Sequence, residues 1–267
     1  IYRKYGINRI SIGLQSPKNK ELAILGRIHN YAQFLESFQM AREAGFSNIN
    51  VDLMFAIPGQ SYEGWIENLR MVAALGPEHI SAYSLIIEEG TPFSRKKLDL
   101  PDEDTEYRMY EDVAAVLKEY GYHQYEISNY AKAGYECRHN EGYWQRKDYL
   151  GLGLGAASLL GKERFSNTSD MQEYLKNSSA PEKIQKNWEL LTREDEMAEF
   201  MFLGLRMTQG VSKKEFQEYF GTAIENIYGE VLKKYKKQGL LLEESGRIFL
   251  SREGIHVSNA VMADFLL

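Results

Sequence analysis

The chain has 267 residues, of which 43% are hydrophobic and 26% charged, and its formal net charge at pH 7 is −6. This composition is typical of a globular protein with enough apolar material for a core, and the acidic balance argues against a whole-surface attraction to nucleic acid or anionic membranes. No apolar run approaches the roughly 20 residues needed to span a bilayer, so we expect no integral membrane segment.

The cysteine content and the first residue set two further expectations. Cys137 is the only cysteine, which excludes an internal disulfide framework and favours a reducing, cytoplasmic location. No signal peptide precedes the first strand. The chain starts with Ile1 rather than Met, and we expect it to begin inside a longer protein. Whether the protein forms a homodimer is left open by the sequence.

Short β-branched runs alternate with helical stretches through the first half of the chain, as in βαβ units with a parallel sheet. The expected strands are Arg9–Leu14, Ile49–Phe55, Ile80–Ile86 and approximately Gln124–Ile127. The expected helices are Tyr31–Ala44, Gly64–Leu75 and Asp102–Tyr120. The repeat of about 35 residues resembles one step of a (β/α) barrel.

Four parallel strands make an incomplete barrel, and a parallel sheet rarely leaves an edge uncovered. We therefore predict an α/β fold that is the C-terminal half of a partial (β/α) barrel, with earlier strands upstream of Ile1. The alternative is an open, doubly wound sheet that is complete as it stands.

The pattern changes near Thr192. Three helices are expected, and they are followed by a β-hairpin with a turn at Ser245-Gly246 and by a last helix, an order typical of a winged helix. The helices are Glu194–Met207, Lys213–Phe220 and Ile224–Gln238, and the hairpin strands are Leu240–Glu243 and Arg247–Leu250. We predict a partial barrel domain over residues 1–176, a polar linker over 177–186 and a winged-helix-like domain over 187–267. A lysine cluster at 233–237 raises the possibility of DNA binding, but a solvated helix face explains it more simply, and no nucleic-acid partner is predicted.

Polar side chains occur where the expected strands end. Gln15 follows the first strand, and Asp52 is embedded in the apolar second strand, where an unpaired carboxylate is costly. Arg27, in the loop after the first strand, can bind a carboxylate with its guanidinium. Because the carboxyl ends of parallel strands meet at one mouth, these three residues can hold a zwitterionic amino acid or a nucleoside. An Arg27–Asp52 structural ion pair is an equally good interpretation.

Residues 137–144, Cys-Arg-His-Asn-Glu-Gly-Tyr-Trp, combine a cysteine, a histidine and two aromatic side chains. An imidazole or thiolate can ligate iron, and aromatic rings can cover a porphyrin; a hydrogen-bonded structural histidine is the simpler interpretation. The glycine-rich segment 151–158 superficially resembles a dinucleotide loop, but its glycines alternate. A backbone lying close against a ligand or another segment is the favoured explanation.

Taken together and in order, these segments resemble the radical S-adenosylmethionine proteins related to oxygen-independent coproporphyrinogen III oxidase, and specifically their haem-chaperone branch. The resemblance covers nearly the whole chain. The segments that carry it begin at Asn8, Leu25, Val51, Ile80, Glu126 and His139, and they read NRISIGLQ, LGRIH, VDLMFAIPGQ, ISAYSL, EISNY and HNEGYW.

The resemblance implies a partial radical-SAM barrel, and it assigns cofactors to particular residues. Gln15, Arg27 and Asp52 become contacts of S-adenosylmethionine. His139 becomes the haem-iron ligand candidate, with Tyr143 and Trp144 as packing partners of haem and Cys137 as a weaker alternative ligand.

The resemblance also implies a [4Fe–4S] cluster, but the family's CxxxCxxC motif is absent, and we expect it upstream of Ile1. Ala56 stands where Gly is usual, and Ala157 where His is common. The implied function is a haem chaperone that binds S-adenosylmethionine and haem and delivers haem to an acceptor protein. The alternative is an oxidase that decarboxylates coproporphyrinogen III. The chain alone is expected to be inert in radical chemistry.

Overall fold

The computed structural model describes residues 1–267. The chain divides into two compact units, Ile1–Glu136 and Cys137–Leu267, called the N-terminal and C-terminal units below. The predicted domains, 1–176 and 187–267, follow a different division and stay a prediction. The expected linker at 177–186 is not an irregular connection, because helices and a strand occupy most of it.

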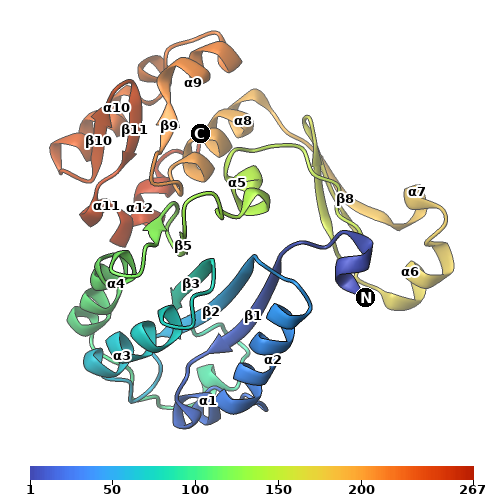
Figure 1. The fold of residues 1–267 in the computed structure, drawn as a ribbon. Coiled ribbons are helices and arrows are strands. Elements are labelled where there is room, and N and C mark those ends of the chain that lie inside the picture. The colour runs from blue at the N-terminus through green and yellow to red at the C-terminus, as the bar shows by residue number, and fades with distance from the viewer. The chain divides into compact units, whose positions relative to one another are not determined.

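The N-terminal unit is a five-stranded open sheet with helices packed against it (Figure 1). The strand order is β1-β2-β3-β5-β4, with β1 and β2 parallel and β2 and β3 parallel. Its strands are β1 (Ile10–Gln15), β2 (Ile49–Phe55), β3 (His79–Ser84), β4 (His123–Gln124) and β5 (Asn129–Ala131). Its helices are α1 (Asn19–Ile24), α2 (Tyr31–Glu43), α3 (Tyr62–Ala73) and α4 (Glu103–Lys118), with 3-10 turns at Tyr2–Tyr5 and Phe93–Arg95.

One face of this sheet is apolar because alternate residues of each strand point to the same side. In β2, Val51 and Leu53 are fully buried on that side, and Ile80 of β3 lies beside them in register with Val51. Helices α2, α3 and α4 cover this face with large side chains such as Phe34, Trp65 and Met109. The opposite face is therefore available for polar side chains.

Capping residues fix where these helices begin. The Asn30 side chain accepts from the backbone of Gln33 in a capping box that starts α2, and Asp102 accepts from the backbone N–H of Thr105 at the start of α4. Gly45, with φ 86°, ends α2 in the left-handed conformation that glycine tolerates best. The three predicted helices of this unit are confirmed with small shifts at their ends.

The predicted fourth parallel strand at 124–127 is wrong. The backbone N–H of Tyr125 donates to the carbonyl of Asn129, and the Glu126 carboxylate accepts from the N–H of Ser128. These bonds close a tight turn, so the chain reverses and β5 inserts antiparallel between β3 and β4. The run reads as one strand in the sequence because its turn contains neither glycine nor proline.

The C-terminal unit contains two small antiparallel sheets and eight helices. One sheet has the order β6-β7-β8 and the other β10-β11-β9. Before α8 come α5 (Arg138–Trp144), β6 (Ala157–Leu160), β7 (Glu163–Asn167), α6 (Met171–Asn177), α7 (Pro181–Ile184) and β8 (Gln185–Leu190). The rest are α8 (Arg193–Gly204), β9 (Val211–Ser212), α9 (Lys213–Phe220), α10 (Ile224–Lys237), β10 (Leu241–Glu244), β11 (Arg247–Leu250), α11 (Arg252–His256) and α12 (Ser258–Ala263).

The winged-helix-like pattern is confirmed, except that two short helices, α11 and α12, follow the hairpin where one was expected. Helices α8, α9 and α10 precede the β10–β11 hairpin, to which β9 adds a third strand. In the lysine cluster of α10, Lys234 pairs with Asp264 and Lys236 pairs with Glu243. Part of the positive charge seen in the sequence is thus compensated within the same unit.

Candidate functional site

The face of the N-terminal sheet that lies away from α2, α3 and α4 is polar. It is formed by the residues that alternate with the core positions, and the register places Gly13 opposite Asp52 and Asp52 opposite Ser81. The polar face consists of Ser11, Gly13 and Gln15 on β1, Asn50 and Asp52 on β2, and His79, Ser81 and Tyr83 on β3. A carboxylate in the middle of an apolar-looking strand is thereby explained, because its side chain never enters the core.

Asp52 is held by neutral donors. Its Oδ2 accepts from the Ser11 hydroxyl at 3.0 Å, and its Oδ1 accepts from Asn50 Nδ2 at 2.7 Å. The side chain is half-buried, and it makes no ion pair with Arg27 at 4.0 Å or less. The structural ion pair considered from the sequence is therefore not formed.

Gln15 ends β1 in a strained conformation beside Asp52. Its φ is 72°, a left-handed value that is uncommon outside glycine, and its side chain is buried. A Cβ on Gly13 would lie 3.0 Å from Gln15 Nε2 and 4.0 Å from Asp52 Oδ2, so the missing side chain of Gly13 leaves room between them. Ala56, just past the end of β2, also has a positive φ, 56°. Strain of this kind at two neighbouring strand ends is typical of a functional site.

Tyr83 connects the three residues that the sequence singled out. Its hydroxyl donates to Gln15 Oε1 at 3.1 Å. Its pKa is raised, first by burial and second by the charge of Asp52, while the Gln15 hydrogen bond and the charge of Arg27 act in the opposite direction. Gln15, Asp52 and Arg27 therefore all influence the pKa of the Tyr83 hydroxyl.

Arg27 itself is exposed, and its loop is tied to β1. The backbone N–H of Arg27 donates to the Leu22 carbonyl, and His29 Nε2 lies 3.3 Å from the Leu14 carbonyl. The guanidinium is thus anchored through its backbone and remains available to an anion.

A buried chain of hydrogen bonds lies behind Asp52. Asn50 Oδ1 is 2.6 Å from His79 Nδ1, and His79 Nε2 is 2.7 Å from the Tyr125 hydroxyl. Because Asn50 gives its Nδ2 to Asp52, its oxygen must accept, so His79 donates from Nδ1 and accepts at Nε2. Burial, and second the charge of Arg9, lower the pKa of His79 to about 3. A neutral histidine therefore orients the amide that orients Asp52.

Glu21 forms a second polar cluster that the sequence did not reveal. This buried carboxylate accepts at Oε2 from Ser16 at 2.6 Å, from Gln60 at 2.9 Å and from Asn68 at 2.8 Å. These partners come from the end of β1, the turn after β2 and helix α3. No local signal identifies the cluster, because its members are far apart in the chain. It fixes the loops that follow β1 and β2.

In the C-terminal unit, helix α5 presents His139. The side chain is exposed, and its ring lies edge-on to Tyr143, one helical turn later, with centroids 4.6 Å apart and planes at 77°. Tyr143 in turn contacts Tyr149 edge-on at 4.7 Å. Cys137, the alternative ligand considered from the sequence, is buried at the residue preceding α5.

Trp144 is separated from this aromatic row. Its ring lies under the guanidinium of Arg206, 4.3 Å from ring centroid to Cζ, and it lines a cavity with residues of α8 and α12. His139 and Tyr143 therefore contact each other, whereas the Trp144 side chain lies apart from them, under Arg206.

The glycine-rich segment 151–158 is explained by a close backbone approach within the unit. A Cβ on Gly151 would overlap the carbonyl oxygen of Ala157. The Ser158 hydroxyl accepts from the Gly151 N–H at 2.9 Å, and Asn167 Nδ2 donates to the carbonyls of Gly151 and Gly153. The interpretation of a backbone lying against another segment is confirmed.

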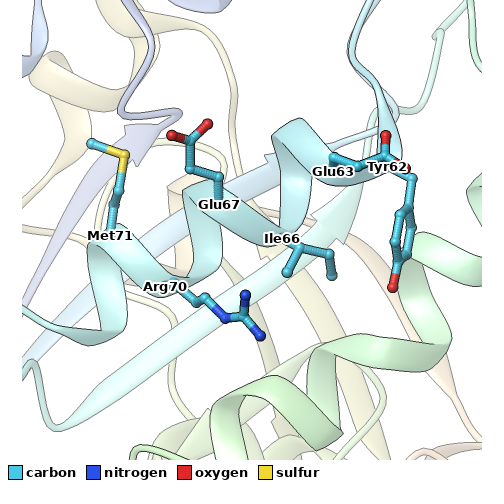
Figure 2. Close-up of a pocket in the computed structure, with 6 residues that line it drawn as sticks. All are labelled: Tyr62, Glu63, Ile66, Glu67, Arg70 and Met71. Atoms are coloured by element: carbon cyan, nitrogen blue, oxygen red, sulfur yellow. The ribbon is translucent and has the colours of Figure 1, made fainter.

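A second hollow lies on the surface of helix α3 (Figure 2). It has a volume of about 320 Å³, and every residue that lines it belongs to that one helix. The lining residues are Tyr62, Glu63, Ile66, Glu67, Arg70 and Met71. None of the residues of the polar sheet face lines it, and we place no site there. No group of three or more histidine, cysteine, aspartate or glutamate side chains is arranged to hold a metal ion.

Two protein-family models match parts of this chain. The model of the radical SAM superfamily matches residues 1–72, and that of the HemN C-terminal domain matches residues 191–257. The heme chaperone HemW of Bacillus subtilis is 37% identical over 270 residues, which cover 100% of this chain and 71% of the relative. The HemW proteins of Lactococcus lactis and Escherichia coli are 37% and 34% identical, with 69% and 68% of their lengths covered.

The chain belongs to the HemW family of radical SAM proteins. The resemblance stated from the sequence motifs is thereby confirmed. The solved coproporphyrinogen III oxidase HemN of Escherichia coli has the same fold, with a TM-score of 0.83 at 20% identity, covering 99% of this chain and 65% of that one. The α/β fold class and the small C-terminal domain are confirmed by this match. None of the helices has the length and apolar character that crossing a membrane requires.

Proposed function

We propose that the N-terminal unit of this HemW-family chain binds S-adenosylmethionine on the polar face of its sheet. The observation that supports it is the shape and chemistry around Gly13. The Gln15 amide and the Asp52 carboxylate lie beside the position where Gly13 lacks a Cβ, and the charge of Arg27 acts on Tyr83, whose hydroxyl donates to that amide. S-adenosylmethionine offers matching groups: a carboxylate, an amino group and ribose hydroxyls.

In this proposal Arg27 binds the methionyl carboxylate, because a guanidinium pairs with a carboxylate through two parallel hydrogen bonds. Gln15 and Asp52 bind the ribose or the amino group. Each oxygen of Asp52 uses one lone pair for Ser11 or Asn50 and keeps another for the ligand. The [4Fe–4S] cluster of the family would need three cysteine ligands, and this chain has one cysteine, so its residues do not fit that group.

The binding test is equilibrium titration of the chain with S-adenosylmethionine. Asp52→Asn and Arg27→Met should each weaken binding by about tenfold or more, since loss of a charged hydrogen-bond partner costs roughly 1.5–3 kcal/mol. Asp104→Asn, an exposed carboxylate in the first turn of α4, is the matched control and should bind as the wild type does. Equal affinity in all four proteins would contradict the assignment.

We further propose that the C-terminal unit binds haem through His139. The exposed imidazole lies edge-on to Tyr143, with Tyr149 next in the same aromatic row, and a ring nitrogen of an exposed histidine can ligate iron. Tyr143 and Trp144 were both assigned to haem packing from the sequence. The contact of Tyr143 with His139 supports its assignment to haem packing, whereas Trp144 packs against Arg206 instead.

The haem test is a spectral titration with haem. His139→Ala should abolish the Soret shift of a histidine-ligated haem, whereas His123→Ala, which removes a half-exposed histidine paired with Glu136, should leave it unchanged. Undiminished uptake by His139→Ala would refute the ligand assignment.

Delivery of haem to an acceptor protein follows as the proposed function of the whole protein, on the strength of the relatives named heme chaperones. The alternative is oxidative decarboxylation of coproporphyrinogen III. Anaerobic incubation of the cluster-containing protein with that substrate separates the two, because only an oxidase forms vinyl-bearing product.

A further inference from the structure

The cavity beside Trp144 lies entirely within the C-terminal unit and has a volume of about 370 Å³. Its wall is mostly apolar, with one cationic side chain, one amide and no carboxylate. The lining residues are Trp144, Phe202, Leu203, Arg206, Asn259, Met262, Ala263 and Leu266. This size is near the lower limit of small-molecule sites, and the combination of apolar wall and few polar groups is typical of them.

Two hydrogen-bond donors in this wall are buried and have no acceptor. They are Nε1 of Trp144 and Nε of Arg206, and the Arg206 guanidinium lies over the Trp144 ring. Buried donors are almost always satisfied in native proteins, so two orphans at one cavity need an explanation. Neither nitrogen is accessible to solvent with the cavity empty, so the donors that a ligand can reach are the terminal nitrogens of the Arg206 guanidinium, which are not among the buried unpaired atoms.

Three carboxylates on neighbouring elements pair with other cations. Glu196 and Glu199 of α8 pair with Arg146, Lys162 and Arg164, and Asp264 after α12 pairs with Lys234. Arg206 forms no ion pair with any carboxylate of the protein at 4.0 Å or less. The guanidinium therefore carries an uncompensated positive charge at the edge of an apolar cavity.

We propose that this cavity binds a small molecule with a carboxylate on an apolar body. The carboxylate accepts from the terminal nitrogens of the Arg206 guanidinium, and the apolar body packs on Phe202 and Met262. This site is separate from the S-adenosylmethionine and His139 sites, and it does not depend on either. The same chemistry occurs in a free aliphatic carboxylate and in the propionate of a porphyrin, and the test distinguishes these two sources.

The first arm is isothermal titration of the chain with decanoate. We expect saturable binding that Arg206→Met weakens at least tenfold. Trp144→Ala, which removes an aromatic ring from the cavity wall, should weaken it severalfold. Arg206→Lys retains the charge and should show an intermediate affinity. Lys214→Met, which removes a well-exposed lysine of α9, is the matched control and should bind as the wild type does. Decylamine, with the opposite charge, should not bind.

The second arm uses metal-free mesoporphyrin, which carries propionates but cannot be ligated by His139. If mesoporphyrin competes with decanoate in the wild type and in His139→Ala, but not in Arg206→Met, the porphyrin propionate is the source of the carboxylate. Binding of decanoate without competition identifies a free carboxylate. The proposal is overturned if neither compound binds saturably, or if both bind equally well to wild type and Arg206→Met. Failure of haem ligation at His139 changes none of these outcomes.

Discussion

Acid should destabilise the N-terminal unit through His79. This imidazole is fully buried, donates to Asn50 and accepts from Tyr125, so the folded state has no room for a second proton on it. Its pKa is lowered from 6.5 to about 3, first by burial and second by Arg9. Between these two values the unfolded chain binds a proton that the folded chain rejects.

The direction follows from linkage: stability rises with pH wherever the unfolded state holds more protons. The contribution of neutral His79 is complete above pH 6.5 and is lost as the pH falls toward 3. Each pKa unit corresponds to about 1.4 kcal/mol, so the free energy of unfolding should fall by about 2 kcal/mol between pH 7 and pH 5 from this residue alone.

The measurement is hydrogen-exchange protection of peptides from β2 and β3, corrected for the pH dependence of the intrinsic exchange rate. His79→Gln keeps a donor and an acceptor but cannot titrate. Between pH 7 and pH 5, the free energy of opening should therefore fall by about 2 kcal/mol less in His79→Gln than in the wild type. Tyr125→Phe removes a hydrogen bond and retains the histidine, so it should be less stable at every pH with the wild-type slope. Parallel curves for wild type and His79→Gln would refute the reasoning.

Three further changes test the fold. Leu53→Ala, at a fully buried position of β2, should cost about 2–5 kcal/mol in urea unfolding, and a cost below 1 kcal/mol would contradict the core assignment. Thr192→Ala should cost about 1 kcal/mol by removing the capping box of α8, whereas Thr192→Ser should restore most of it. Gly151→Ala should lower the melting temperature of the C-terminal unit, because the new methyl group overlaps the Ala157 carbonyl; an unchanged melting temperature would refute that close approach.

The sequence predicts the parallel strands well because their signal is local. Residues 49–55 alternate between the core and the opposite face of the sheet, and the expected and observed bounds of β2 agree. Gln15 and Asp52 could be assigned to one site for the same reason, since parallel strands bring their carboxyl ends to one edge. The chain reversal at Glu126–Ser128 could not be predicted in this way, because a side chain closes the turn and no glycine or proline marks it.

Long-range polar clusters are the part of the site that sequence reasoning misses. Glu21 accepts from Ser16, Gln60 and Asn68, and His79 lies between Asn50 and Tyr125. Neither cluster has a characteristic spacing of its residues in the sequence, because the order of the strands in the sheet decides which side chains meet. A buried glutamate or histidine can be recognised in the sequence only as a polar residue in an apolar setting.

The HNEGYW segment shows how helix geometry divides a motif. His139 and Tyr143 are four residues apart, so they lie on one face of α5 and their rings meet edge-on. Trp144 is one residue further, and a rotation of about 100° per residue turns it to a different side of the helix. It therefore packs under Arg206 rather than beside His139. The two adjacent aromatic residues look like one stacking pair in the sequence, but they lie on two different surfaces. A substitution of Tyr143 should therefore affect the proposed haem ligation at His139. A substitution of Trp144 should instead affect binding in the cavity beside Trp144.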